Sequence, residues 1–169
     1  MIRATFRFPG LLVSLLLSAT VSGCGFTPLY ATRGVESGLP AIDVIVPQGR
    51  VAYLLRENLD DLIGRDKTRA PLWRLDIQVV QIRDPRGLRL DNVAERYDLG
   101  LTVKYSLTSI ASGKVAHTGE VVSQVSYDAA NAPYAGLAAR QDSQERAAAD
   151  AARRIQVQLA GWMAGRTGD

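Results

Sequence analysis

Cys24 is the only cysteine of this 169-residue chain, and its thiol is the most distinctive reactive group in the sequence. The residues at positions 21–23, just before it, are small. Upstream lie Arg3, Arg7 and an apolar run over residues 11–17. A short basic start, an apolar segment too brief to span a bilayer and small residues before a cleavage point are typical of a secretory signal. The thiol would then stand at the start of the processed chain, where no second cysteine exists for a disulfide.

This pattern predicts that residues 1–23 are a signal peptide. The small residues before Cys24 resemble the lipobox of bacterial lipoproteins, and in that family the thiol receives a diacylglyceryl group. After cleavage the new amine is acylated as well, commonly with palmitate. Each acyl methylene in the membrane contributes about 0.8 kcal/mol, so several chains on one residue give lasting attachment without a transmembrane helix. The alternative is an ordinary signal peptide with a cysteine placed there by chance.

The charge balance argues against one class of partner. The formal net charge is +3, and two of the positive charges, Arg3 and Arg7, leave with the signal peptide. A nearly neutral mature chain lacks the basic surface of a nucleic-acid-binding protein. After Cys24 no apolar run approaches the length of about 20 residues that a membrane span needs.

Three arginines surround a predicted turn at residues 84–87, namely Arg83, Arg86 and Arg89. Guanidinium groups bind phosphate and carboxylate through two parallel hydrogen bonds, so a cluster at the end of a sheet could hold an anionic head group. The alternative is a solvated loop whose charge is partly neutralised. The acidic residues that would do so are Asp84, Asp91 and Glu95.

The sequence offers little for catalysis. His117 is the sole histidine and has no obvious nucleophile or orienting carboxylate beside it, as a catalytic base would need. Asp60 and Asp61 lie on an amphipathic helix and are interpreted as its solvated face. The chain lacks the ligand set of a usual zinc site and has no phosphate loop or nucleophile elbow. We expect no enzyme activity, no cofactor and no metal.

The rest of the chain alternates between strand and helix periodicities. Alternating apolar residues predict strands over residues 42–46, 72–83, 97–108 and 115–127, and helical spacing predicts helices over residues 51–63 and 148–163. The start of the last helix stays open between Pro133 and Asp142. In the second strand the apolar phase slips at Val80, which suggests a bulge or a strand that leaves the sheet.

These elements predict an α+β single domain in the order β-α-β-β-β-α, with a four-stranded mixed sheet. The helix that joins the first two strands allows them to be parallel, and the last three strands form an antiparallel meander. Because each strand has one apolar face, both helices should pack on the same face of the sheet. We expect a tether over residues 24–40, the domain over residues 41–164 and a frayed tail over residues 165–169.

The opening Cys24-Gly25-Phe26-Thr27-Pro28-Leu29-Tyr30, followed by this order of elements, resembles the LptE family of lipopolysaccharide-assembly lipoproteins. Further motifs are similar to alphaproteobacterial members. They are Asp84-Pro85-Arg86, Tyr97-Asp98-Leu99, Ser126-Tyr127-Asp128 and the run Ala138-Ala139-Arg140-Gln141-Asp142-Ser143-Gln144-Glu145-Arg146.

The resemblance implies a non-enzymatic protein at the periplasmic face of the outer membrane. It would plug the lumen of the LptD β-barrel, help that barrel assemble and bind lipopolysaccharide on its way to the outer leaflet. Gly25, which is not aspartate, implies sorting to the outer membrane. The family's basic ligand contacts cannot be placed here by motif, so Arg83, Arg86 and Arg89 as lipopolysaccharide contacts remain a hypothesis of our own.

Two other functions stay open. An auxiliary lipoprotein of an ABC-type lipid transporter would share the anchor and a small α/β domain, although the opening from Phe26 to Tyr30 favours the first interpretation. A lipid-anchored hydrolase would need a nucleophile with a positioned base, for which His117 is the available candidate.

Overall fold

The computed structural model describes residues 33–88, 94–129 and 132–166. The expected signal peptide, the lipid acceptor Cys24 and the candidate contact Arg89 lie outside the described residues.

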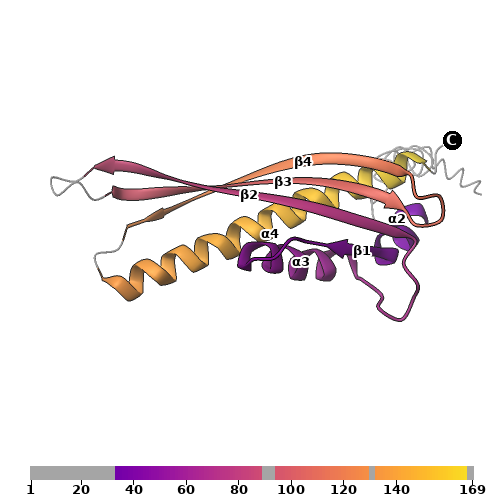
Figure 1. The fold of residues 1–169 in the computed structure, drawn as a ribbon, viewed down its shortest axis with the longest axis horizontal. Helices are drawn as coiled ribbons and strands as arrows, with labels where there is room; N and C mark the ends of the chain where they lie inside the picture. The colour runs from indigo at the N-terminus through magenta and orange to yellow at the C-terminus, as the bar shows by residue number, and fades with distance from the viewer. Residues whose placement is uncertain (1–32, 89–93, 130–131, 167–169) are drawn as a thin grey trace, which may run out of the picture.

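The described chain forms a four-stranded sheet with helices (Figure 1). In chain order the elements are α2 (Arg33–Gly38), the 3-10 helix η3 (Leu39–Ala41), β1 (Ile42–Ile45), α3 (Arg50–Ile63), β2 (Trp73–Leu88), β3 (Ala94–Ser109), β4 (Val115–Asp128) and α4 (Pro133–Arg166). The strands lie in the order β1-β2-β3-β4, with β1 parallel to β2 and the other neighbours antiparallel. The α+β class, the parallel first pair and the antiparallel meander are therefore confirmed.

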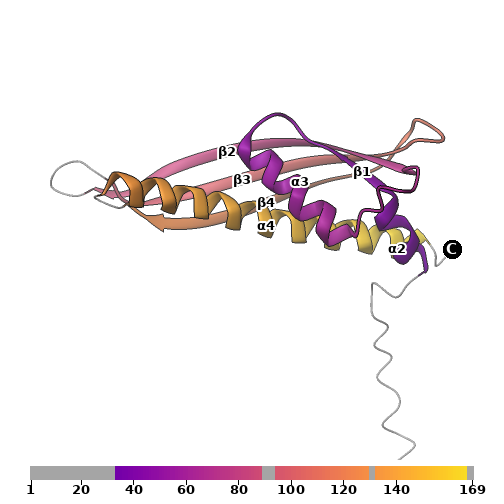
Figure 2. The same cartoon turned by 90° about the horizontal axis from the view of Figure 1, so that it is seen from below.

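The helices lie on one face of the sheet, which we call the inner face (Figures 1 and 2). Odd-numbered residues of β3 from Tyr97 to Leu107 point to this face, and four of them from Leu99 to Tyr105 are at most 4% exposed. The opposite, outer face has polar side chains and a few exposed apolar ones. A sheet with one buried and one solvated face has the hydrophobic alternation that the sequence shows.

α4 is 34 residues long and runs beneath β3 and β4 (Figure 1). It begins at Pro133, where the missing amide hydrogen of proline costs nothing because the first turn has no partner for it. Its buried stripe is made of small residues followed by larger ones. The fully buried members are Ala147, Ala148, Ala151, Ala152, Ile155, Leu159 and Ala160. Among the described residues no helix is both long and apolar enough to cross a membrane.

α3 follows the predicted helix closely and stops where expected. Gly64 caps its C-terminus in the left-handed region with φ 62°, and its amide donates to the carbonyl oxygen of Asp61 at 3.2 Å. Glycine adopts this conformation without a steric penalty, which explains why the helix ends at this residue.

The segment predicted as a tether differs from the prediction after residue 32. Arg33–Gly38 and Leu39–Ala41 are helical, and α2 packs on α4. Val35 and Leu39 bury their side chains in the core, where they are at most 5% exposed. The tail also differs, since α4 continues to Arg166.

Two predictions about β2 were wrong. The strand runs through the expected turn at residues 84–87, and its pairing with β3 keeps one register from Trp73 to Arg86 without a bulge. Pro85 is tolerated because β2 is an edge strand at this point, where a missing amide hydrogen breaks no ladder. The apolar phase slips because Val80 and Ile82 lie on the outer face, 54% and 55% exposed.

We expect Ile155→Ala to lower the free energy of unfolding by about 2–5 kcal/mol, because Ile155 is fully buried and its truncation leaves a cavity. The neighbouring Val157→Ala removes a side chain that is 53% exposed and should change stability by about 0.5 kcal/mol or less. Denaturant unfolding of both variants measures the difference. Equal effects would contradict the assignment of the buried stripe.

A candidate anion-binding site at the end of the sheet

Three strands bring polar and aromatic side chains together at the end of the sheet distant from β1. Pro85 lies opposite Tyr97, and Tyr97 lies opposite Tyr127, so these three share the inner face. The next row, Arg86, Arg96 and Asp128, lies on the outer face, because successive side chains of a strand point to opposite faces.

On the inner face the first turns of α4 lie near this end of the sheet and enclose a cavity of about 290 Å³. Its lining includes Arg83 from β2, Tyr97 from β3, Tyr127 from β4 and Arg140 from α4. We call these four residues the arginine–tyrosine notch. Four elements thus each supply one side chain to the same cavity.

The two tyrosines form the wall of the notch. Their rings stack with centroids 5.5 Å apart and an interplanar angle of 27°. The Arg83 guanidinium carbon lies 4.6 Å from the centroid of the Tyr97 ring, within the range of a cation–π interaction. Tyr127 is only 8% exposed, and in the described part of the chain its hydroxyl has no hydrogen-bond partner.

The notch has an excess of positive charge. Among the described residues neither Arg83 nor Arg140 has an ion pair, whereas Asp128, which also lines the cavity, pairs with Arg96 at 3.2 Å. The Tyr127 hydroxyl is buried, so its missing partner costs free energy within the fold. The two guanidinium groups and the aromatic faces suit an anionic group attached to a partly apolar or sugar-like body.

The outer face has a separate charged network. Asp98 accepts hydrogen bonds from the Ser126 hydroxyl at 2.7 Å and from Arg86 Nε at 2.8 Å. These bonds, that of Ser126 first, lower the pKa of Asp98 from its ordinary value of 3.8, and the charges of Arg86 and Arg96 act in the same direction. Arg86 is therefore already engaged in an exposed ion pair.

The structure separates the arginines that the sequence grouped. Arg83 lies on the inner face and Arg86 on the outer face, because an odd number of positions separates them in one strand. Arg89 lies outside the described residues. Of the two described members of the predicted cluster, Arg83 belongs to the notch and Arg86 does not.

Sequence reasoning missed Arg140, Tyr97 and Tyr127 as parts of this site. All three fall within the sequence motifs that carry the family resemblance, as does Pro85. That shared membership was the available signal. Their convergence depends on long-range pairing, which residue spacing alone does not give.

His117 lies at the other end of the inner face. Its ring stacks on Trp162 with centroids 5.4 Å apart, and its Nε2 lies 3.5 Å from the Tyr105 hydroxyl. That hydroxyl lies 2.6 Å from Gln158 Oε1, and burial raises the pKa of Tyr105 to about 12. This is a packed aromatic cluster. Within the described ranges no group of three or more His, Cys, Asp or Glu residues could hold a metal ion.

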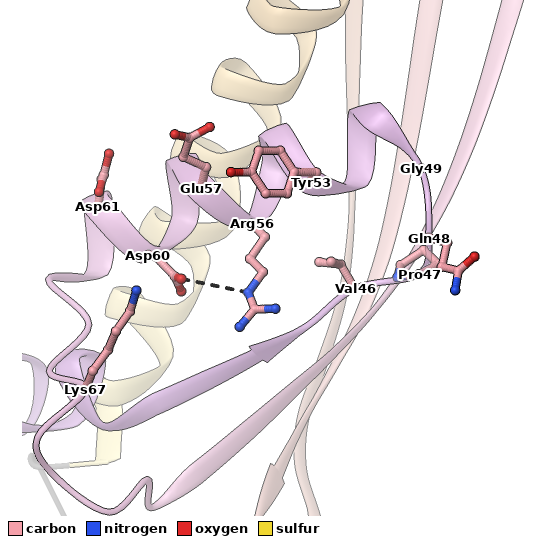
Figure 3. Close-up of a pocket in the computed structure, with 10 residues that line it drawn as sticks. All are labelled: Val46, Pro47, Gln48, Gly49, Tyr53, Arg56, Glu57, Asp60, Asp61 and Lys67. Atoms are coloured by element: carbon pink, nitrogen blue, oxygen red, sulfur yellow. Dashed lines mark ion pairs between the residues drawn. The ribbon is translucent and has the colours of Figure 1, made fainter.

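A second cavity, of about 600 Å³, lies between the end of β1 and the solvent side of α3 (Figure 3). Its lining includes Tyr53, Arg56, Asp60, Asp61 and Lys67. Arg56 Nε pairs with Asp60 at 3.8 Å, and Asp61 is exposed, which agrees with the solvated helix face expected from the sequence. Three acidic side chains, Glu57 among them, face two basic ones here, so the cavity lacks the positive charge excess of the notch.

Comparison with known protein families shows which family the chain belongs to. The family described as "LptE: Lipopolysaccharide-assembly" matches residues 39–159. The chain belongs to the LptE family. The match begins in η3 and ends within α4, so it includes the sheet, α3 and all four residues of the notch.

Solved structures agree with LptE membership. A crystal structure from Caulobacter crescentus CB15, of a protein described as a lipoprotein, is 47% identical, with a TM-score of 0.69 over 79% of this chain and 97% of that chain. The rare lipoprotein B of Shewanella oneidensis shares the fold at 18% identity, with a TM-score of 0.54 over 71% of this chain and 92% of that chain. Lipoprotein B of Nitrosomonas europaea does so at 14% identity, with a TM-score of 0.55 over 72% and 82%.

A comparison with curated proteins gives no match. LptE is a non-enzymatic family of lipoproteins, so membership supports a role in lipopolysaccharide assembly.

The outer-face network makes a prediction for the pKa of Asp98. Ser126→Ala should raise it toward 3.8, because the largest stabilising hydrogen bond to the carboxylate is lost. Arg86→Gln should raise it as well, because a hydrogen bond and a charge are lost, and Arg96→Gln should raise it least. Because the folded-state pKa is lowered, the stability that Asp98 contributes is present above its unfolded pKa and is lost as the pH falls through the folded value. Carboxyl NMR titration measures all three variants, and an unchanged pKa in Ser126→Ala would contradict the network.

Proposed function

We propose that this chain is an outer-membrane lipoprotein, anchored by acyl chains on Cys24, that plugs an LptD-like β-barrel. It assists the assembly of that barrel and helps deliver lipopolysaccharide to the outer leaflet. LptE membership supports the assembly role, and the predicted signal peptide before Cys24, together with Gly25, supports the anchor and its membrane. The proposal includes no catalytic step.

The surface of the domain fits the polar lumen of a large outer-membrane barrel. The outer face of the sheet contains rows of charge pairs, among them Lys104 with Glu120 at 3.8 Å and Arg86 with Asp98 at 2.8 Å. Exposed pairs of this kind add little to stability, but they keep the face compatible with water and with polar side chains.

The arginine–tyrosine notch is the observation that carries the ligand assignment. Arg83 and Arg140 line one cavity without ion pairs of their own in the described chain, and the Tyr127 hydroxyl beside them has no partner. Lipopolysaccharide presents phosphate groups on a sugar body, which matches guanidinium forks and aromatic faces. Arg86 and Arg89 are retained in the proposal as a second, peripheral pair of contacts.

We expect the double variant Arg83→Ala, Arg140→Ala to weaken lipopolysaccharide binding by about tenfold or more, because charge-assisted hydrogen bonds contribute about 1.5–3 kcal/mol each. The matched control is Arg74→Ala, Arg153→Ala, which removes the same charge from the same two elements, away from the notch. Titration of the purified variants with lipopolysaccharide measures the affinity. The variant Arg86→Ala, Arg89→Ala should lose less. Equal losses of affinity in the notch and control variants would show that only the net charge matters, and would contradict a binding site at the notch.

The partner and the anchor are tested together by affinity capture from membranes. We expect the wild-type protein to be recovered with an outer-membrane β-barrel, and Cys24→Ala to leave the membrane fraction because no acyl chain can be attached. Mass spectrometry identifies the captured protein and the modification. Recovery of transporter components in place of a barrel would favour the ABC-type alternative.

A further inference from the structure

The edge of β2 is left open along most of its length. β1 pairs only with residues Trp73 to Asp76, whereas β2 continues to Leu88. Beyond Asp76 no described residue pairs with β2 on that side, and Figure 1 shows the strand running well past β1. At about 3.3 Å per residue, this leaves roughly 40 Å of strand edge with unpaired backbone groups.

The first part of this edge lacks the usual protection. Residues 77–82 read Ile-Gln-Val-Val-Gln-Ile, without charge, proline or glycine. Natural sheets guard exposed edges with lysine, proline, bulges or a covering element, and such devices appear here only from Arg83 to Arg86. Val80 and Ile82, on the outer face of this segment, are 54% and 55% exposed.

The other edge of the sheet differs. α4 packs along β4 and lines a cavity beside it with Arg153, Arg154 and Val157, and Glu120 adds a charge from the strand itself. An added strand there would have to displace or desolvate these groups. On the β2 edge, by contrast, no described residue is paired with the strand beyond Asp76.

We propose that residues 77–82 of β2 accept an extended segment of the partner barrel as an additional strand. The proposal rests on the proposed function for the identity of the partner. Only another extended backbone matches a row of alternating amide and carbonyl groups, which is the principle of strand addition. Alternate side chains of the segment would pack on Val80 and Ile82 and extend the apolar strip of the outer face.

The unpaired charge of Asp84 predicts which kind of residue lies at one end of the added segment. Asp84 lies directly opposite Asp98, and like charges in this position destabilise a sheet. Arg86 and Ser126 satisfy Asp98, whereas Asp84 has no ion pair among the described residues. A lysine or arginine of the added strand placed beside Asp84 would relieve this. The expected partner segment is therefore uncharged over about six positions, with a basic residue at its Asp84 end.

The test uses the full lipidated protein and the captured barrel, and compares two double variants in the same two rows of the sheet. Val80 and Ile82 share rows with Val122 and Gln124 of β4, through Thr102 and Gly100. We expect Val80→Lys, Ile82→Lys to weaken barrel binding by about tenfold, and Val122→Lys, Gln124→Lys to change it by less than about threefold. All four side chains are exposed, so the variants should fold, and thermal unfolding checks that they do.

Hydrogen exchange gives an independent measurement on the wild-type complex. Those amides of residues 77–82 that point away from β3 should exchange more slowly with the barrel bound than without it, because they gain hydrogen-bond partners. Equal losses of barrel binding in both double variants would indicate docking over the whole outer face. A loss confined to the β4 variant would indicate docking at the other edge. Either result overturns the inference, and so does unchanged exchange at residues 77–82. Failure of the wild-type protein to capture any barrel overturns the proposed function and this inference with it.

Discussion

The close approach of α4 to a single face of the sheet is the constraint on which the structure depends. Ala147, Ala148, Ala151 and Ala152 are fully buried, and their small side chains allow the helix to lie near both α3 and the strands. Larger residues farther along the helix then fill the core toward the end of the sheet where β1 lies. Because apolar burial is concentrated on this face, the opposite face can carry polar side chains. The ends of the long strands can also extend beyond the helices that cover the sheet.

The elements whose patterns extend over many residues were predictable from the sequence. β3 alternates over its whole length because one face is buried throughout, and α3 ends at a glycine that adopts the left-handed conformation. β2 was harder, because beyond Val79 its inner face is no longer the centre of the core. There Gln81 takes an inner position and lies 3.4 Å from Gln144 of α4, while Ile82 points to solvent. Where neither face of a strand is clearly buried, apolar residues no longer alternate with polar ones. The sequence of β2 therefore suggested a bulge and a turn that the strand does not have.

The candidate site was less accessible to sequence reasoning, for a reason of geometry. Arg83 and Arg86 are close in the chain, but strand alternation places them on opposite faces, whereas Arg140 comes from a distant helix. The stacking of Tyr97 on Tyr127 depends further on an irregularity in the β3–β4 pairing between Leu107 and Thr108. A shift of one residue in this pairing would place the two rings on different faces. No local pattern reveals such an offset.

The length of α4 has a consequence for the scale on which this domain acts. At 1.5 Å per residue its 34 residues extend about 50 Å, and α2 packs near its C-terminal end while the notch lies near its N-terminal end. The hydrocarbon layer of a membrane is about 30 Å thick. One copy of this domain, standing upright in a protein-lined passage, is thus tall enough to touch both boundaries of that layer simultaneously.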